Sequence, residues 1–136
     1  MSQRSQSIIV FACNWDGLSC IEAAAKDGLT YSASVRVVRV GCLSRVHAGL
    51  ILKSFELGAA GVLLLGCAPG NCHLDTEPGG PEREYEKARA LLELLGLGSH
   101  RIALARPLRG DGEALVRNVA NLARAVRPGK DPVRRG

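Results

Sequence analysis

Three short stretches of the chain are largely hydrophobic and have the length of strands. They cover residues 7–13, 35–40 and 61–65, and residues 102–108 form a weaker fourth candidate. Hydrophobic runs of this length are typical of buried strands in a parallel sheet. Pro107 lies within the fourth run and has no backbone N–H to donate, which favours an edge strand or a strand end there.

Helical patterns fill the segments between and after these runs. The first is an alanine-rich segment, residues 17–27, that ends at Gly28. In the other three, hydrophobic side chains recur at the spacing of one helix face: Val46, Leu50, Ile51 and Phe55 between Ser44 and Gly58; Tyr85, Ala88, Leu91, Leu92 and Leu95 between Pro81 and Gly96; and Leu115, Val119, Leu122 and Val126 after the cap residue Asp111. This alternation predicts an α/β fold with a single doubly wound, four-stranded parallel sheet and helices on both faces, a flavodoxin-like arrangement. We expect one such domain over residues 1–127 and a basic tail over residues 128–136.

Composition and charge narrow the class of protein. The 136 residues are 46% hydrophobic and 23% charged, as in ordinary globular domains. The hydrophobic runs fall far short of the roughly 20 residues of a membrane span, and the N-terminus lacks a signal-peptide cleavage site, so we expect a cytoplasmic protein without a membrane partner. Residues 101–136 hold nine of the 18 basic residues and only three of the 13 acidic ones. Because this basic segment lacks interleaved aromatic residues and any DNA-reading motif, we expect an acidic protein partner rather than nucleic acid.

The positions of four cysteines predict a shared site. Cys13 lies at the C-terminal end of the first predicted strand, Cys42 lies two residues past the second, and Cys67 and Cys72 follow the third. The C-terminal ends of parallel strands meet at one edge of a sheet, where α/β proteins bind their ligands. We therefore expect these four thiols to lie close together, whereas Cys20 falls within the first helix.

Several chemistries use clustered thiols. The C-x4-C spacing of Cys67 and Cys72 recurs among 2Fe–2S ligands, and helix N-termini at this edge stabilise negative sulfur. Structural zinc also accepts four cysteines, although usually in C-x2-C pairs, and four independently buried cysteines are a further interpretation. The sequence has no G-x-G-x-x-G after a strand, no Walker phosphate loop and no G-x-S-x-G, which disfavours nucleotide-dependent and hydrolytic functions. A phosphatase-type nucleophile at Cys13 requires an arginine where Ser19 stands.

Longer motifs around these cysteines carry a resemblance to a known family. They are Cys13-Asn-Trp15, Val35-Arg-Val-Val-Arg-Val-Gly-Cys42, Ser44-Arg-Val46 and the stretch from Ile51 to His73, which includes Gly66-Cys-Ala-Pro-Gly-Asn-Cys-His73. From about residue 8 to residue 125 the chain resembles the delta subunit of methyl-viologen-reducing hydrogenase. The resemblance implies a small 2Fe–2S protein that passes electrons between a hydrogenase or formate dehydrogenase and the heterodisulfide reductase A-like flavoprotein of a larger complex. It also implies that the cluster ligands are Cys13, Cys42, Cys67 and Cys72.

Two positions depart from the family pattern: Asp16, and Leu74, which stands where an aromatic residue commonly follows the histidine. The first family motif is usually C-x-x-C, and Asp16 stands where its second cysteine would be. Either Asp16 coordinates, or the cluster is of another type, or it is lost; Asp16 itself either tunes the charge of the site or is merely solvated. Cys20, one helical turn later, either compensates or is buried in the helix, and we favour burial. Two hypotheses follow: a non-catalytic electron-transfer subunit with one 2Fe–2S cluster, and a structural or docking subunit that holds zinc or no metal.

Overall fold

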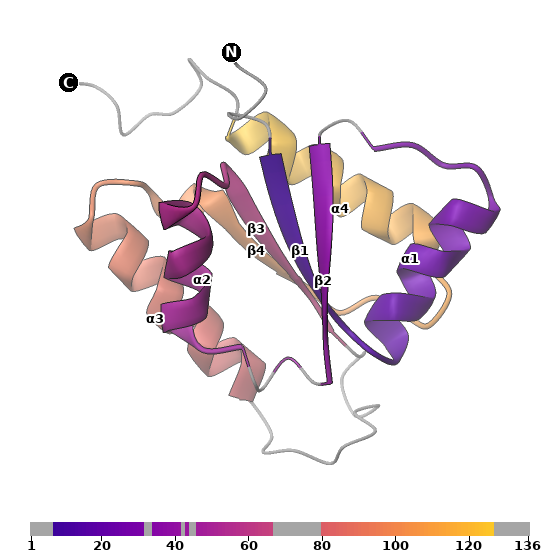
Figure 1. Ribbon diagram of the computed structural model, residues 1–136, viewed down its shortest axis with the longest axis horizontal. Coiled ribbons are helices and arrows are strands. Elements are labelled where there is room, and N and C mark those ends of the chain that lie inside the picture. The colour runs from indigo at the N-terminus through magenta and orange to yellow at the C-terminus, as the bar shows by residue number, and fades with distance from the viewer. Residues whose placement is uncertain (1–6, 32–33, 42, 44–45, 67–79, 127–136) are drawn as a thin grey trace.

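The hydrophobic runs form a four-stranded sheet in which all strands are parallel (Figure 1). The computed structural model describes residues 7–31, 34–41, 43, 46–66 and 80–126. Its elements, in chain order, are β1 (Ser7–Cys13), α1 (Asp16–Lys26), β2 (Ser34–Val40), α2 (Ala48–Glu56), β3 (Gly61–Leu65), α3 (Gly80–Leu94), the short 3-10 helix η3 (Ser99–Arg101), β4 (Ile102–Ala105) and α4 (Gly112–Ala125). The strand order β2-β1-β3-β4 is that of the first four strands of flavodoxin-like proteins. The predicted α/β fold is confirmed.

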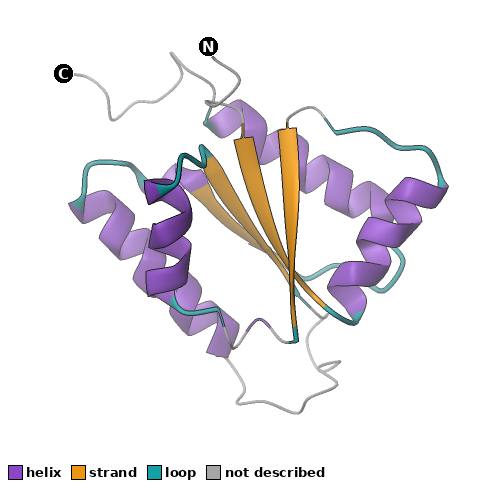
Figure 2. Ribbon diagram, in the orientation of Figure 1, coloured by secondary structure: helices purple, strands orange, loops and turns teal. Residues whose placement is uncertain are grey.

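Helices cover both faces of the sheet (Figure 2). The helices α1 and α4 pack together on one face, and α2 and α3 pack together on the other. Neighbouring side chains of β1 alternate between the faces, so Val10 joins the hydrophobic cluster under α1 and α4, and Phe11 joins the cluster under α2 and α3. The predicted stripe of the last helix is confirmed, because the structure buries Leu115, Val119, Leu122 and Val126.

The carboxyl ends of β1, β2 and β3 lie at one edge of the sheet, which is its lower edge in Figure 1. Cys13 at the end of β1 pairs with Val40 at the end of β2, and Ala12 pairs with Leu65 at the end of β3. The strands end at the same edge because all of them are parallel and run in the same direction. The segments that follow these strands therefore begin side by side.

The strand β2 differs from the prediction, because it is an exposed edge strand and not a buried one. Val37 and Val38 are 36% and 38% exposed. The strand packs on β1, and no helix among the described residues packs on it to a comparable extent. A hydrophobic pattern shows that a strand forms, but it does not show how many neighbours cover that strand.

Two helices bury narrower faces than predicted. The helix α2 begins at Ala48 and not near Ser44, which lies outside the described residues, and its Leu50 is 44% exposed. In the segment of α3, Leu91 is 37% exposed, and Leu95 lies past the last helical residue and is 63% exposed. Because α2 and α3 contact each other beside the sheet, residues that face away from both the sheet and the neighbouring helix stay in water.

Glycines follow three helices at the predicted ends. Gly28, Gly58 and Gly96 have φ angles of 70°, 108° and 81°. These left-handed conformations suit glycine because it has no Cβ atom to clash with the backbone. No helix in the described ranges is long and hydrophobic enough to span a bilayer. The predicted tail, residues 128–136, lies outside the described residues.

Candidate functional site

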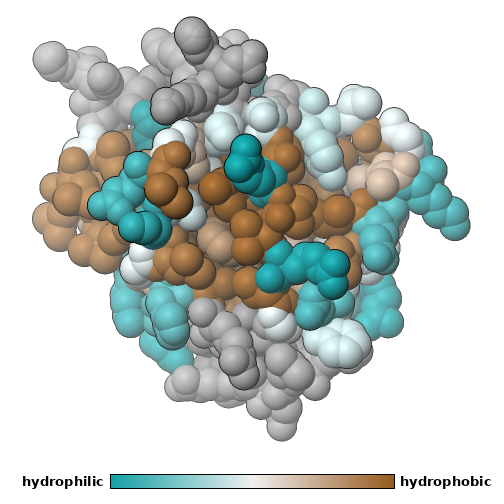
Figure 3. Space-filling model, in the orientation of Figure 1, coloured by the Kyte–Doolittle hydropathy of each residue, from teal (hydrophilic) through white to brown (hydrophobic). Residues whose placement is uncertain are grey.

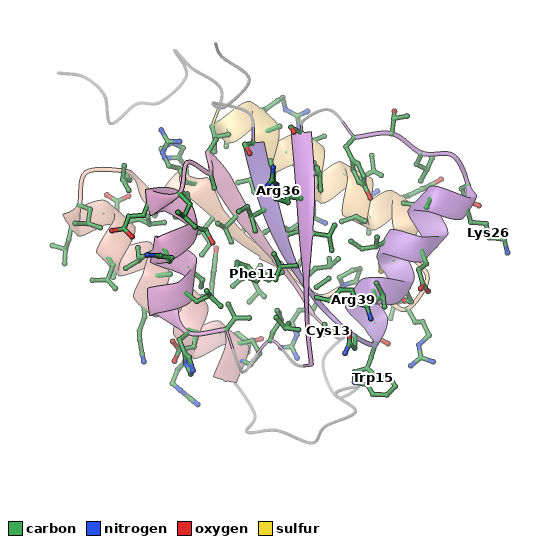
Figure 4. All side chains as sticks on the ribbon, in the orientation of Figure 1. Phe11, Cys13, Trp15, Lys26, Arg36 and Arg39 are labelled. Carbon is green, nitrogen blue, oxygen red and sulfur yellow. The ribbon has the colours of Figure 1, made fainter. Side chains whose placement is uncertain are left out.

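Cys13 is the last residue of β1, and its side chain is buried at the carboxyl edge of the sheet (Figure 4). It is 1% exposed, and its Sγ accepts a hydrogen bond of 3.1 Å from the backbone N–H of Gly17. Gly17 lies in the first turn of α1, where backbone N–H groups have no partner within the helix. A sulfur that accepts such a bond is suited to the negative charge of a metal-bound thiolate. The surroundings of Cys13 are compatible with a metal-bound thiolate.

Gly17 also brings the end of β3 next to Cys13. A Cβ atom on Gly17 would lie 2.5 Å from the carbonyl oxygen of Leu65 and 3.2 Å from Cys13 Sγ, so glycine alone fits there. A Cβ atom on Gly66 would lie 2.6 Å from Leu43 Cδ1, so the chain that leaves β3 packs against the segment after β2. The first turn of α1 and the end of β3 therefore lie close to the buried Cys13 sulfur, and the segments after β2 and β3 contact each other.

The other three predicted ligands lie outside the described residues. Cys42 and Cys67 are each next in sequence to a residue of the contact between Gly66 and Leu43, and Cys72 follows five residues later. The described residues contain no group of three metal-binding side chains, and they include only the first of the four predicted cysteines. The assignment of these four thiols as one ligand set stays a prediction.

Asp16 is buried and forms an ion pair with Arg109. The Asp16 side chain is 1% exposed, and its Oδ1 accepts a hydrogen bond of 3.1 Å from Arg109 Nε. The interpretation of Asp16 as a solvated side chain is therefore wrong. A carboxylate removed from water needs a charged partner or several hydrogen bonds, and Arg109 provides one from the loop after β4. Sequence reasoning missed Arg109 because it lies 93 positions away and no local pattern connects it to Asp16.

Cys20 is a buried helix residue, as the sequence favoured. It is 0% exposed and belongs to the hydrophobic cluster between α1, α4 and the sheet. Its thiol donates to the carbonyl oxygen of Leu108 at 3.4 Å. Burial raises the pKa of the Cys20 thiol, because the charged form is poorly solvated there. Cys20 thus packs α1 against the loop that also carries Arg109.

Known proteins are similar to this chain over most of its length. Residues 8–128 match the family described as methyl-viologen-reducing hydrogenase, delta subunit. The chain belongs to this family. The family resemblance that the motifs carry is therefore confirmed.

Relatives of this delta-subunit family member include small iron-sulfur proteins and a part of a larger polypeptide. The chain is 35% identical over 95 residues to the iron-sulfur subunit of the F420-non-reducing hydrogenase vhc of Methanococcus voltae, which is 70% of this chain and 66% of that one. It is 29% identical over 128 residues to the iron-sulfur subunit of the F420-non-reducing hydrogenase vhu of Methanocaldococcus jannaschii. These 128 residues cover 93% of this chain and 96% of that one. It is 22% identical over 119 residues to the A polypeptide of the ferredoxin:CoB-CoM heterodisulfide reductase of Methanosarcina mazei, which is 88% of this chain but 15% of that protein.

Two exposed side chains of this delta-subunit chain lie near the end of the sheet that holds Cys13. Trp15 directly precedes α1 and is 42% exposed, and it lies with Cys13 at the same end of the sheet (Figure 4). Arg39 of β2 pairs in register with Ala12, one residue before Cys13, and its side chain is also exposed. Exposed aromatic and arginine side chains are enriched in protein interfaces, so this surface is suited to contact with another protein.

Proposed function

We propose that the chain is an electron-transfer subunit that holds one 2Fe–2S cluster on Cys13, Cys42, Cys67 and Cys72. It passes electrons between an oxidoreductase of the hydrogenase or formate dehydrogenase type and a heterodisulfide reductase A-like flavoprotein in the same complex. Four cysteine thiolates are the common ligand set of such a cluster. The observation that carries the proposal is the buried Cys13 sulfur, which accepts an N–H bond from the first turn of α1 close to the end of β3.

The relatives support both parts of the proposal. Two of them are named iron-sulfur subunits of hydrogenases. The third is the A polypeptide of a heterodisulfide reductase, in which the similar sequence makes up 15% of the chain. In that organism, a sequence similar to this chain is part of the A polypeptide itself. Such a fusion supports direct contact between the two proteins where they are separate chains.

The surroundings of Cys13 support the proposal of a bound cluster. A 2Fe–2S cluster supplies one-electron oxidation and reduction when it is bound. Burial of Cys13 keeps water from its sulfur, and the Gly17 N–H offsets part of the negative charge there. Hydrogen bonds to cluster sulfurs and exposure to solvent both influence a cluster's reduction potential, so these two features would tune it. The sequence contains no hydrolase or nucleotide-binding motif, which agrees with a subunit that works through its partners.

The proposal is tested by the metal content and the electron paramagnetic resonance (EPR) spectrum of the chain after anaerobic purification. We expect about two irons and two sulfides per chain and a signal from the reduced cluster. Cys67→Ser or Cys72→Ser should remove most of this iron, because both thiols come from one loop and no other cysteine is near them in sequence. One zinc per chain, or no metal after anaerobic reconstitution, would contradict the proposal and favour a docking subunit.

Two control variants test the ligand assignment. Cys20→Ala should keep the cluster, because that thiol is bonded to Leu108 within the core. Asp16→Asn should keep the EPR signal, because an amide oxygen can still accept the bond from Arg109. Loss of iron in Cys20→Ala, or a new signal in Asp16→Asn, would require a different ligand set.

A further inference from the structure

The strand β2 has one edge without a neighbouring strand. It stands first in the order β2-β1-β3-β4, and over all seven residues it pairs with β1 without a bulge. Within the described part of the chain, no strand pairs with its outer backbone groups. A regular open edge of this kind can accept an extended segment of another polypeptide as an additional strand.

Both faces of β2 expose hydrophobic side chains. Val37 pairs with Val10 and Val38 pairs with Phe11, so the two valines point to opposite faces of the sheet, and they are 36% and 38% exposed. Figure 3 shows hydrophobic side chains gathered across the middle of this side of the molecule, with a few hydrophilic ones among them. An added strand would cover hydrophobic surface on both of its faces.

The two edge strands of the sheet differ in length and in how they are protected. The strand β4 is four residues long, and Pro107 follows it after one intervening residue. Short strands, prolines and bulges are among the devices that keep natural sheet edges from pairing. None of these three occurs in β2. The protective device that β2 does carry is the charge of Arg36 and Arg39, which leaves the edge open to a segment of opposite charge.

Two arginines on β2 favour a partner segment with negative charge. Arg36 and Arg39 are exposed on β2 (Figure 4), and neither forms an ion pair with a carboxylate among the described residues. Two copies of this chain joined through β2 would bring together four guanidinium groups, two on each face of the sheet, with no carboxylate on either strand to offset them. An acidic segment would instead neutralise both arginines.

We propose that β2 is the docking edge for an extended, acidic segment of a partner subunit, which joins the sheet as its fifth strand. The identification of this partner as a subunit of the redox complex rests on the proposed function. The location agrees with that function, because Val40 at the end of β2 pairs with Cys13. A segment bound there holds the partner beside the candidate cluster site.

Zero-length crosslinking tests the chemistry of the partner. Arg36→Lys and Arg39→Lys variants of the full chain are purified within the complex that it forms in its host and treated with a carbodiimide, which joins an amine to a carboxylate in contact with it. We expect crosslinks from both introduced amines to aspartate or glutamate in one segment of another subunit. Lys26 at the end of α1, away from β2 in Figure 4, is the control amine and should not join that segment. Crosslinks only to a second copy of this chain, or none in an intact complex, would overturn the proposal.

Two proline variants test the strand pairing itself. The backbone N–H groups of successive strand residues point to opposite sides of the strand. Because proline has no N–H, one of the variants Val37→Pro and Val38→Pro loses a hydrogen bond to β1, and the other loses an N–H that points to the open edge. We expect the first to lower the melting temperature of the chain. We expect the second to keep the melting temperature and the iron content but to weaken partner binding roughly tenfold or more. If that stable variant bound the partner as tightly as the wild type, the proposal of an added strand would be wrong, while the proposed electron-transfer function would stand. If the wild-type chain contained no iron, the proposed function itself would be refuted.

Discussion

Gly17 has two roles at the site. Its N–H donates to Cys13 Sγ, and its missing side chain lets the Leu65 carbonyl approach the first turn of α1. A methyl group at this position would meet backbone and not the movable end of a side chain. Because backbone atoms cannot move aside as the end of a flexible side chain can, any substitution at Gly17 would displace α1 or the end of β3 next to Cys13.

We therefore expect Gly17→Ala to damage the cluster site. The added methyl group would push α1 away from the end of β3, lengthen the N–H···S bond and lower the free energy of unfolding by about 1–3 kcal/mol. Gly49→Ala is the matched control, because nothing lies within 4 Å of a Cβ atom there and alanine favours a helix by up to about 1 kcal/mol. Urea denaturation and iron retention measure both effects. Equal iron retention in the two variants would show that the approach at Gly17 does not matter.

At the scale of elements, α2 depends on its neighbour α3 for its N-terminal cap. The residue before α2, His47, makes no side-chain cap bond. Instead, Glu84 of α3 accepts the Ala48 N–H at 2.9 Å through Oε1 and the Lys87 ammonium at 3.1 Å through Oε2. The Ala48 N–H first, and then Lys87, lower the pKa of Glu84. A carboxylate with a lowered folded-state pKa stabilises the fold above its unfolded pKa and loses that contribution as the pH falls through its folded pKa.

Glu84→Gln should therefore destabilise the chain in a pH-dependent way. We expect a loss of about 1 kcal/mol at pH 7, as for a helix cap, and a difference from wild type that shrinks as the pH falls below the unfolded glutamate pKa of about 4.3. Glu86→Gln on the same helix is the control, because its bond to Arg89 joins two exposed side chains and such pairs contribute little. Denaturant unfolding of the isolated chain across this pH range measures the difference. A Glu84→Gln difference that stayed constant with pH would exclude the charge as its cause.

At the scale of the whole molecule, the net positive charge is concentrated towards the C-terminus. Residues 101–136 contain nine basic and three acidic residues, whereas the rest of the chain contains nine basic and ten acidic ones. Such a field attracts an acidic surface over a distance of about 10 Å at 0.1 M salt and only about 3 Å at 1 M. The basic segment therefore affects how fast the chain meets a partner more than how tightly it stays bound.

We expect neutralisation of Arg127, Lys130, Arg134 and Arg135 together to slow assembly at low salt and to matter less at high salt. Truncation after Arg127 should leave the EPR signal of the cluster unchanged, because the removed residues contain no cysteine. Association rates at two ionic strengths provide the measurement. An unchanged salt dependence would mean that the tail is an ordinary solvated end.

The sequence by itself determined the order of the main strands and helices and the end of β1 at which Cys13 lies. Strands and helices leave periodic hydrophobic patterns, and the parallel order follows from their alternation, so the end of β1 at Cys13 was predicted to the residue. The stripe on α4 and its cap at Asp111, whose side chain accepts the Ala114 N–H, were predicted for the same reason. The ligand set beyond Cys13 stays a prediction, since those residues lie outside the described ones.

Only the tertiary structure decided which elements are covered and which distant side chains meet. The hydrophobic runs that became β2 and β3 both resemble buried strands, yet β3 is buried at every residue and β2 is largely exposed. The pairs Asp16 with Arg109 and Glu84 with Ala48 lie 93 and 36 positions apart, and no local pattern records them. Periodicity reports the conformation of a segment from its own residues, whereas burial and ion pairing depend on neighbours that the chain supplies only after it has folded.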